Sequence, residues 1–492
     1  LGVADGIALA NQLKDNRKVT IAFTGDGATS QGDFHESLNV AAVWNLPVIF
    51  IIENNGYGLS TPSAEQFRCK QFIDKGIGYG MEAHQVDGNN ILEVYQKVTE
   101  LKESMKYNQR PILLECITFR MRGHEEASGT KYVPDELFDE WSKKDPVINY
   151  ENFLVEENLL DAEKIELIRS EIKAEIELSL EKAYAEELIQ VSTENELNDV
   201  YADFEIEEVA PSTELSEVRM IDSVADAIEL AMAKHHNLIL MGQDIAEYGG
   251  VFKATDGLVT KYGKSRVRNT PLCEAAIVGS ALGLSINGFK AMMEMQFADF
   301  VTEGFNQIVN NLAKIHWRWG QNADVVIRMP TGAGVAAGPF HSQSNEAWFA
   351  HIPGLKIVYP SNAYDAKGLL LTAFEDPNPV MVFEHKALYR SMTEQVPKGY
   401  YNLPFGKANL ISEGNELSII TYGMGVHWAK KVIEEKGVKA DILDLRTLVP
   451  LDWQSVFKSA KKTGKVIVLH EDTLFGGIGG ELASEISEQC FE

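Results

Sequence analysis

Two apolar strand patterns, each followed by a polar turn that contains glycine, constrain this chain more than any other feature. The patterns at 19–23 and 47–52 lead to Asp26 and Asn55, which stand 29 residues apart. A helical pattern lies between them, which predicts a strand, a crossover helix and a second, parallel strand. Because the carboxyl ends of parallel strands meet at one edge of a sheet, we expect both side chains to lie at that edge.

The residues in these turns are oxygen donors suited to a hard cation. The Asp26 carboxylate, the Asn55 amide oxygen and the main-chain carbonyl of Tyr57 suit Mg²⁺, which keeps positions for water and substrate phosphates. Gly27 and Ala28 leave the backbone at the start of the following helix open to a phosphate group. Either segment alone is typical of an ordinary turn, but both at crossover spacing favour a metal and phosphate site.

Composition limits the alternatives. The chain has 492 residues, of which 45% are hydrophobic, so we expect about three domains. The net charge of −27 and the absence of a basic stripe argue against nucleic acid or an anionic membrane as a partner. No apolar run reaches the roughly 20 residues that span a bilayer. These features predict a cytoplasmic enzyme, and helical patterns at both ends indicate a fragment of a longer chain.

Alternating strand and helix patterns recur three times, which predicts an α/β protein with three doubly wound domains in series. The predicted divisions are 1–150, 151–214, 215–395 and 396–492, and the second of these is an acidic helical segment with a linker. Within it, isoleucines at three- and four-residue steps predict a helix that docks by one apolar stripe, and 191–214 lacks any pattern. A further helix is predicted at 305–316.

Five motifs then carry a resemblance to a known family. They are Gly25–Pro62, Arg120–His124, Thr270–Glu274, Met295–Phe300 and Phe340–Ser344. In this order they resemble the thiamine diphosphate-dependent first component of 2-oxoacid dehydrogenase complexes, over nearly the whole chain. Residues 1 to about 190 resemble its alpha subunit, and those from about 215 onward resemble its beta subunit. The resemblance implies a transketolase-like fold, thiamine diphosphate and Mg²⁺ as cofactors, and a diphosphate-binding, a pyrimidine-binding and a C-terminal domain.

The resemblance also assigns roles to individual residues. Glu274 precedes an apolar helix, where a carboxylate without a partner is costly, and in the family this glutamate bonds a pyrimidine nitrogen of the cofactor. His341 acts when the acyl group passes to lipoamide, and His124 contacts the diphosphate or a reaction intermediate. The catalytic residues are therefore Glu274, His341 and His124. The cofactor-binding residues are Gly25, Asp26, Gly27, Ala28, Asn55, Tyr57, Arg120, Gln296 and Phe300, and the metal ligands are Asp26, Asn55 and Tyr57.

Some of these roles have plainer explanations. Phe300, which resembles the aromatic residue that faces the pyrimidine, could equally be a core residue. Arg120 suits a phosphate because its guanidinium binds bidentately, but a solvated basic loop has the same composition. Kinase-regulated relatives place a serine directly after the histidine, where this chain has Glu125, so we do not expect phosphoregulation there.

The sequence favours oxidative decarboxylation of a 2-oxo acid with acyl transfer to a lipoyl group. The motifs around His341 and Gln296 favour a branched-chain substrate over pyruvate by a small margin. The implied partners are the lipoyl domain and the core acyltransferase of the complex, and the implied assembly is a homodimer or larger. A transketolase- or synthase-type thiamine enzyme and a non-catalytic scaffold remain as alternatives.

Overall fold

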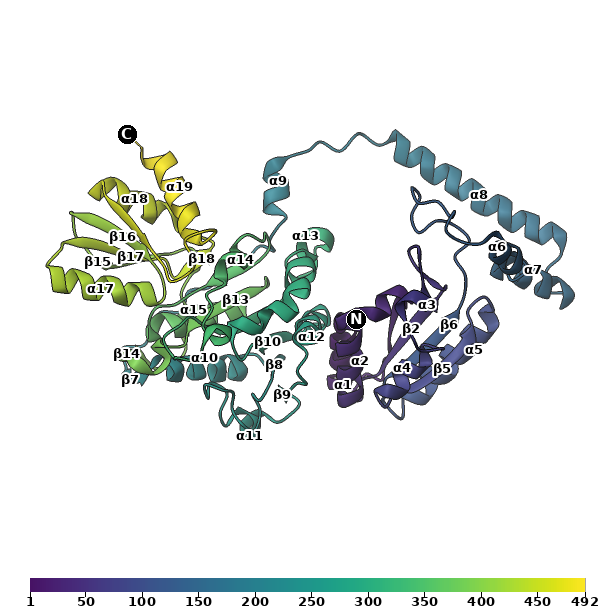
Figure 1. Cartoon of the computed structure of the whole chain (residues 1–492), viewed down its shortest axis with the longest axis horizontal. Coiled ribbons are helices and arrows are strands. Elements are labelled where there is room, and N and C mark those ends of the chain that lie inside the picture. Colours follow the sequence, from purple (N-terminus) through teal and green to yellow (C-terminus); the bar gives the residue numbers. More distant parts are fainter. Residues whose placement is uncertain (492) are drawn as a thin grey trace. The chain divides into compact units, whose positions relative to one another are not determined.

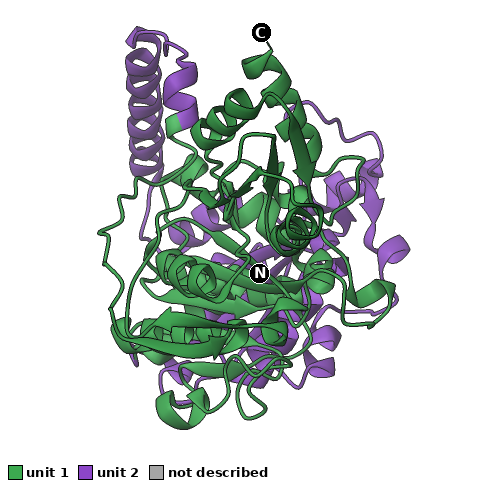
Figure 2. Cartoon of the chain, turned by 90° about the vertical axis from the view of Figure 1, so that its left-hand side faces the viewer, with its two compact units in different colours: residues 1–14, 198–492 green, residues 15–197 purple. Residues whose placement is uncertain are grey.

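The computed structural model describes residues 1–491 and separates into two compact units (Figure 2). One unit comprises residues 15–197, and the other comprises residues 1–14 and 198–492. Figure 1 labels the helices and strands along the chain. In the described part of the chain, no helix combines the length and the apolar character needed to cross a membrane.

The unit of residues 15–197 is built on a four-stranded sheet in which all strands are parallel. The strand order is β1 (Thr20–Gly25), β2 (Val48–Asn54), β6 (Ile112–Ile117) and β5 (Glu82–Asp87). The apolar residues of β2 and β6 are buried, and helix α5 (Ile91–Met105) packs on the sheet through Leu101 and Met105. The remaining elements of this unit are η1 (Gly27–Ser30), α2 (Gly32–Trp44), β3 (Tyr57–Gly58), β4 (Thr61–Pro62), α3 (Ser63–Gln66), α4 (Ile73–Gly78), α6 (Asp135–Ser142), α7 (Pro146–Glu156) and α8 (Ala162–Ala185), and α9 (Thr193–Asn198) follows at its end.

Helix α8 forms where a helix is predicted, but the predicted docking of its apolar stripe is wrong. None of its residues is buried, and Ile172 and Ile176 are 53% and 54% exposed. The helix is instead supported by local contacts: the Asp161 carboxylate caps its first turn by accepting from Lys164 N at 2.8 Å. The apolar spacing therefore predicted the helix correctly. It did not predict that the apolar stripe is exposed.

The prediction that residues 191–214 are an unpatterned linker is also only partly right. Helix α9 begins within this segment, and the chain beyond it is tied to the second unit through main-chain bonds. Ala202 N donates to Asn378 Oδ1 at 2.7 Å, and Val209 N donates to Asn402 Oδ1 at 2.8 Å. The hydrophobic pattern cannot reveal these hydrogen bonds, because they join backbone N–H groups to asparagine side chains.

The second unit contains a larger sheet of seven strands, whose order is β18 (Thr447–Val449), β12 (Lys356–Val358), β13 (Val380–His385), β11 (Val325–Thr331), β10 (Lys290–Glu294), β8 (Leu238–Gly242) and β9 (Val267–Asn269). All neighbouring strands are parallel except β18, which is antiparallel to β12. The strands β8, β11 and β13 are buried along their whole length, as expected for a parallel sheet covered on both faces.

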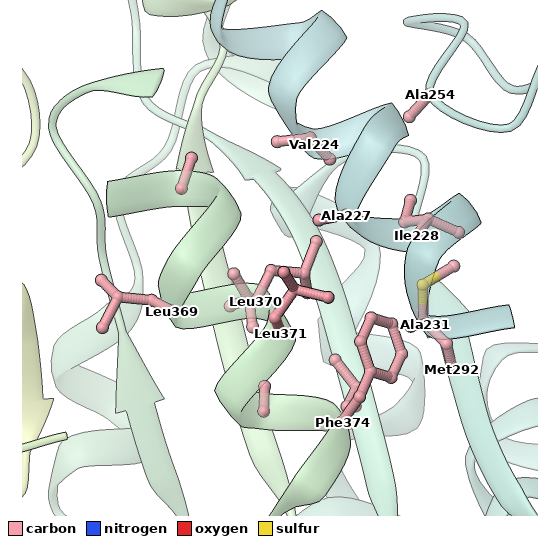
Figure 3. Packing of buried hydrophobic residues seen from close by; sticks show 14 of the residues in the cluster. Val224, Ala227, Ile228, Ala231, Ala254, Met292, Leu369, Leu370, Leu371 and Phe374 are labelled. Atoms are coloured by element: carbon pink, nitrogen blue, oxygen red, sulfur yellow. The ribbon is translucent and has the colours of Figure 1, made fainter. Parts of the chain in front are cut away.

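Helices α10 (Met220–Lys234) and α15 (Ala363–Glu375) pack against each other over this sheet, and their contact is the centre of the core (Figure 3). Ile228 of α10 and Phe374 of α15 are 0% and 2% exposed, and Met292 of β10 lies in the same cluster. Burial of such side chains contributes about 1.5 to 3 kcal/mol each. This cluster therefore packs α10 and α15 onto the seven-stranded sheet.

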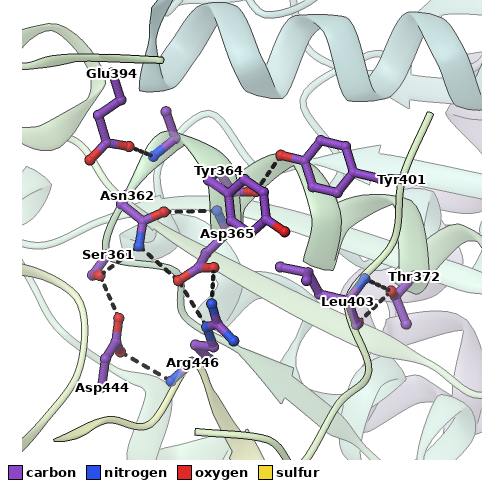
Figure 4. A network of polar contacts seen from close by, with 11 residues as sticks. Ser361, Asn362, Tyr364, Asp365, Thr372, Glu394, Tyr401, Leu403, Asp444 and Arg446 are labelled. Atoms are coloured by element: carbon purple, nitrogen blue, oxygen red, sulfur yellow. Dashed lines mark hydrogen bonds and ion pairs between the residues drawn. The ribbon is translucent and has the colours of Figure 1, made fainter. Parts of the chain in front are cut away.

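The C-terminal region forms a separate four-stranded sheet within this unit, in the order β15 (Asn409–Ser412), β17 (Ala440–Asp444), β16 (Leu417–Thr421) and β19 (Val466–Leu469). A buried polar network joins it to the larger sheet (Figure 4). Arg446 donates twice to the Asp365 carboxylate, at 2.9 and 2.6 Å, and Ser361 Oγ donates to Asp444 Oδ2 at 2.5 Å. Burial, together with the Asp365 charge, raises the pKa of Asp444 to about 7.

The remaining elements of the second unit are α1 (Gly2–Leu13), β7 (Leu215–Arg219), α11 (Leu258–Tyr262), α12 (Glu274–Ile286), η2 (Ala298–Gly304), η3 (Gln307–Leu312), α13 (Ile315–Trp319), η4 (Pro339–His341), α14 (Glu346–Ala350), α16 (Leu388–Ser391), β14 (Thr393–Pro397), α17 (Met424–Lys436), α18 (Trp453–Thr463) and α19 (Ile478–Cys490). The single helix predicted at 305–316 is wrong, because η3 is a π-helical turn and α13 is a separate short helix. Over one turn, both helix types leave similar apolar spacing, so the pattern does not distinguish them.

Candidate active site

The predicted metal ligands follow two adjacent strands of the four-stranded sheet. Strands β1 and β2 are parallel, and Gly25 at the end of β1 pairs with Glu53 near the end of β2. Asp26 follows β1 directly and Asn55 follows β2, so both lie at the carboxyl edge of the sheet, as predicted. Asp26 is 1% exposed, which is unusual for a carboxylate and indicates a polar or ionic partner.

Local hydrogen bonds hold both turns. Asn55 Oδ1 accepts from Tyr57 N at 3.0 Å, which is the short-range bonding that makes asparagine common in turns. Asp26 Oδ2 accepts from Ser63 Oγ at 2.6 Å, and Asp26 O accepts from Thr29 Oγ1 at 2.8 Å. One buried carboxylate and one amide oxygen set in a turn are donors that suit Mg²⁺. Among the described residues there is no cluster of three or more His, Cys, Asp or Glu side chains that could hold a metal.

The backbone at Gly27 is closely approached by a second loop. A Cβ atom at Gly27 would lie 2.7 Å from the Cα of Gly58, so no larger residue fits without movement, whereas Gly25 has open space beside it. The expectation that Gly27 and Ala28 begin the long crossover helix is wrong in detail. They begin the 3₁₀ turn η1, and α2 starts later. An open backbone beside Gly25 fits the approach of a phosphate group.

Glu115 supports these turns, and the sequence analysis missed it. This carboxylate is 0% exposed and accepts from Asn54 Nδ2 at 2.8 Å, from Phe72 N at 3.0 Å and from Gln85 Nε2 at 3.1 Å. It therefore ties the Asn54 turn to two other segments, with the charge-assisted bonds that a buried carboxylate requires. The signal in the sequence was a single Glu inside the apolar strand β6.

Arg120 and His124 lie together, as predicted. Arg120 Nη1 donates to His124 Nδ1 at 3.2 Å, and Arg120 Nη2 donates to Leu59 O at 2.6 Å and to the Tyr132 hydroxyl at 3.0 Å. These bonds hold the guanidinium against the loop that follows Asn55 and Tyr57. A cation held at this position is available to an anionic ligand.

In the second unit, Glu274 is the first residue of α12, as predicted. Its Oε1 accepts from Gln243 Nε2 at 3.2 Å, and Gln243 stands directly after β8. Burial, with a smaller effect from the Glu303 charge, raises the pKa of the Glu274 carboxyl. The raised pKa gives this carboxyl a strong affinity for a hydrogen-bond donor or a proton. The partner Gln243 was not predicted.

Helix α12 is held at close range by α1. A Cβ atom at Gly6 would lie 2.1 Å from Ser280 O, and one at Gly283 would lie 2.1 Å from Val3 O, so glycine allows the two backbones to touch. This contact leaves little freedom for α12 to shift. The position of Glu274 at its first turn is therefore set by backbone packing.

The aromatic residues around His341 form a cluster. The His341 ring lies edge-on to Phe297, with centroids 4.8 Å apart, and to Phe300, with centroids 5.5 Å apart. The structure thus brings His341 and Phe300 together, which was not predicted, and adds Phe297, which the sequence analysis missed. Gln296 Nε2 donates to Asp244 Oδ2 at 2.8 Å, which links this segment to the loop after β8.

Comparison with protein families identifies three segments. Residues 1–192 match the family described as dehydrogenase E1 component, residues 216–392 match the transketolase pyrimidine binding domain, and residues 406–492 match the transketolase C-terminal domain. Consecutive matches of this kind agree with the alpha-then-beta order of the motifs.

Comparison with individual proteins identifies the family. The chain is 44% identical over 281 residues to the 2-oxoisovalerate dehydrogenase subunit beta of Bacillus subtilis (strain 168), covering 56% of this chain and 86% of the relative. It is 42% identical over 285 residues to the mitochondrial 2-oxoisovalerate dehydrogenase subunit beta of Dictyostelium discoideum, covering 56% and 77%. The chain belongs to the E1 dehydrogenase family. It is also 41% identical over 281 residues to the pyruvate dehydrogenase E1 component subunit beta of Bacillus subtilis (strain 168), covering 56% and 86%.

This E1 dehydrogenase component joins an alpha-like region and a beta-like region in one chain. The predicted family and the transketolase-like α/β fold are thereby confirmed, and the E1 and pyrimidine-binding segments imply the use of thiamine diphosphate. The domain boundaries and the roles of the individual site residues stay predictions. Asp26, Asn55, Arg120 and His124 belong to one unit of the E1 chain, and Glu274, Gln296, Phe300 and His341 belong to the other.

Proposed function

We propose that this E1 component decarboxylates a branched-chain 2-oxo acid oxidatively and transfers the acyl group to the lipoyl group of its acyltransferase. The observation that carries the proposal is the position of Glu274 at the start of α12 and of His341 in its aromatic cluster, within a chain of the E1 family. The branched-chain preference rests on the motifs around His341, because the identities to 2-oxoisovalerate dehydrogenases (44, 42 and 38%) and to pyruvate dehydrogenases (41 and 40%) overlap. Pyruvate is the alternative substrate.

The alpha-like unit supplies the cation and diphosphate site in this proposal. Asp26, Asn55 and the main-chain carbonyl of Tyr57 would hold Mg²⁺. The backbone at Gly25 to Ala28, which has open space beside Gly25, would receive the diphosphate, with Arg120 as its cation. His124, which Arg120 contacts, faces the same ligand or the substrate. Bound thiamine diphosphate supplies an electron sink for loss of the carboxylate.

The beta-like unit supplies proton transfer. The Glu274 carboxyl would bond a pyrimidine nitrogen of the cofactor, and burial raises its pKa, which favours a carboxyl that takes part in proton transfer. Phe300 faces the pyrimidine, and Gln296 holds the neighbouring segment. His341 would deliver the proton that the lipoyl step requires. The electron pair left by decarboxylation forms the bond from the acyl carbon to one sulfur, the S–S bond breaks, and the other sulfur takes the proton.

A variant of His341 can separate decarboxylation from acyl transfer to the lipoyl group. We expect His341→Ala to decarboxylate the 2-oxo acid with an artificial electron acceptor at a nearly normal rate and to lose acylation of a lipoyl domain by about 10² to 10⁴-fold, the range for a lost acid or base. Equal losses in both assays would assign His341 to substrate binding or decarboxylation. Normal acylation would remove it from the mechanism.

The substrate and the reaction class are tested together. We expect the full protein, assayed with lipoyl domain against pyruvate, 2-oxoisovalerate and 2-oxoglutarate, to show its highest kcat/KM with 2-oxoisovalerate. A higher value for pyruvate would select the alternative substrate. Ketol transfer without 2-oxo acid oxidation would indicate a transketolase-type enzyme, and absence of cofactor binding in calorimetry would indicate a scaffold.

We further propose a lipoyl acyltransferase as the partner, an assembly of at least two chains, and a cytoplasmic location. The E1 family model supports the first, because E1 components serve multienzyme complexes. The net charge of −27 supports the absence of nucleic acid from the partners. Mass measurement of the native protein tests the assembly.

A further inference from the structure

The loop that carries His341 is anchored at one residue, Gln343. Its main-chain N and its side-chain Nε2 both donate to Asp299 Oδ1, each at 3.1 Å. Its carbonyl O accepts from Gly332 N and from Thr331 Oγ1, also at 3.1 Å each. The backbone two residues after His341 is therefore held on both sides, by the end of β11 and by the turn η2.

Asp299, which accepts these two bonds from Gln343, is buried. The residue is 6% exposed, lies in the same 3₁₀ turn as Phe300 and stands two residues after Phe297. A second bond from this loop, from Asn345 Nδ2 to Ala298 O at 2.9 Å, runs to the start of the same turn. The turn thus holds the loop by hydrogen bonds and holds the His341 ring by aromatic contact.

A buried lysine lies close enough to Asp299 for the two charges to interact. Lys386, at the end of β13, is 3% exposed, and its Nζ lies 5.5 Å from the centroid of the Phe297 ring with no hydrogen-bond partner among the described residues. Burial lowers the pKa of Lys386 to about 8, and the charges of Asp299 and Glu471 oppose that shift.

We propose that Asp299 is a positioning residue for the acyl-transfer step, which clamps Gln343 and thereby sets His341 against Phe297 and Phe300. This inference rests on the proposed role of His341. Asp299 itself contacts neither substrate nor cofactor in this account, since both of its bonds go to Gln343. Its effect passes through the loop.

The test combines an activity ratio with a structural readout in the full protein. We expect Asp299→Ala to slow acylation of a lipoyl domain by about 10²-fold, the loss that a displacement of about 1 Å can cause, while decarboxylation with an artificial electron acceptor stays within a few-fold of wild type. Hydrogen exchange of the peptide spanning 338–346 should accelerate in the same variant. Asp203→Ala, at an exposed aspartate of the same unit, is the control and should change neither readout.

Asp299→Asn is a second variant, which distinguishes loss of the clamp from a failure of Asp299→Ala to fold. Its amide oxygen can still accept both bonds from Gln343, so acylation and loop exchange should return most of the way to wild type. If hydrogen exchange of the loop peptide is unchanged in Asp299→Ala, Asp299 does not clamp the loop. This result is independent of the role of His341. If exchange accelerates, acylation stays normal and His341→Ala remains defective, the clamp does not position the histidine. If His341→Ala acylates normally while Asp299→Ala frees the loop, the role of His341 fails and the clamp stands.

Discussion

The two sheets carry their candidate site residues in different ways. In the four-stranded sheet, β1 alternates between more and less buried positions, and Phe23 is 66% exposed, whereas β11 of the seven-stranded sheet is buried at every residue. The first sheet holds Asn55 by a bond within its own turn, to Tyr57, and holds Asp26 by a single side-chain bond from Ser63. The second holds its site through buried polar groups that lie far apart in sequence, as between Asp299 and Gln343.

This difference predicts where each region is vulnerable. Substitution in the turns after β1 and β2 should remove ligand binding at a smaller cost in folding stability, because each of these side chains makes few bonds to the rest of its unit. Substitution of the buried polar groups in the second unit should act mainly on stability or on the placement of a loop. Four variants test the contrast, beginning with the largest effect.

Asp26→Ala should abolish Mg²⁺-dependent binding of thiamine diphosphate. The variant removes the only carboxylate of the proposed ligand set, while the lost bond from Ser63 costs about 1.5 to 3 kcal/mol of folding stability. Calorimetric titration of the cofactor, with and without Mg²⁺, measures the loss. Asp139→Ala, at an exposed aspartate of α6, is the matched control, and unchanged affinity in Asp26→Ala would refute the metal assignment.

Arg328→Met should destabilise the second unit by about 3 to 5 kcal/mol, because it leaves two buried carboxylates without their cation. Arg328 is 0% exposed and donates to Glu384 at 2.7 Å through Nε and Nη2, and to Glu294 through Nη1. Denaturant unfolding of the apo protein measures the change. Lys398→Met, which breaks an exposed pair with Glu214, should cost at most about 1 kcal/mol, and equal effects of the two variants would contradict the contrast.

The sequence predicted residues that lie in turns and missed residues that lie inside apolar segments. Asp26, Asn55 and His341 stand in polar loops directly after or between recognisable strands, and β16 has the predicted bounds 417–421. Glu115 is a single charge within an apolar strand, and Lys386 directly follows the buried strand β13. Their importance depends on partners about 30 or more residues away, such as Gln85 for Glu115, and no local pattern reveals those partners.

Glu346→Gln should make folding stability less dependent on pH. Burial raises the pKa of Glu346 to about 7 from 4.5, with the nearby Asp472 and Glu471 charges contributing, although the Tyr422 hydroxyl donates to its Oε1 at 2.8 Å. Because the folded-state pKa is the higher one, ionisation opposes folding as pH rises from about 4.5 to about 7, and this penalty reaches about 3 kcal/mol. Relative to the variant, the wild type should therefore lose stability across that window. If the free energies of unfolding of the two proteins change with pH in the same way, Glu346 does not have the raised pKa described.

Ile172→Ser with Ile176→Ser should have the smallest effect. Both side chains are more than half exposed on α8, so the double variant should change the free energy of unfolding by at most about 0.5 kcal/mol per site. Thermal unfolding measures it, and Ile49→Ser, in the buried strand β2, is the control that should lose far more. A large loss in the double variant would show that the stripe is covered in the native protein.

Proton exchange of the bound cofactor tests the central claim most directly, namely that the beta-like unit supplies the proton chemistry of an E1 dehydrogenase through Glu274. Glu274→Gln keeps the shape of the side chain and its contact with Gln243 but loses the titratable carboxyl. We expect exchange at the thiazolium carbon, followed by NMR, to slow by about 10² to 10⁴-fold while calorimetric affinity for thiamine diphosphate is retained. An exchange rate within a few-fold of wild type would contradict the account.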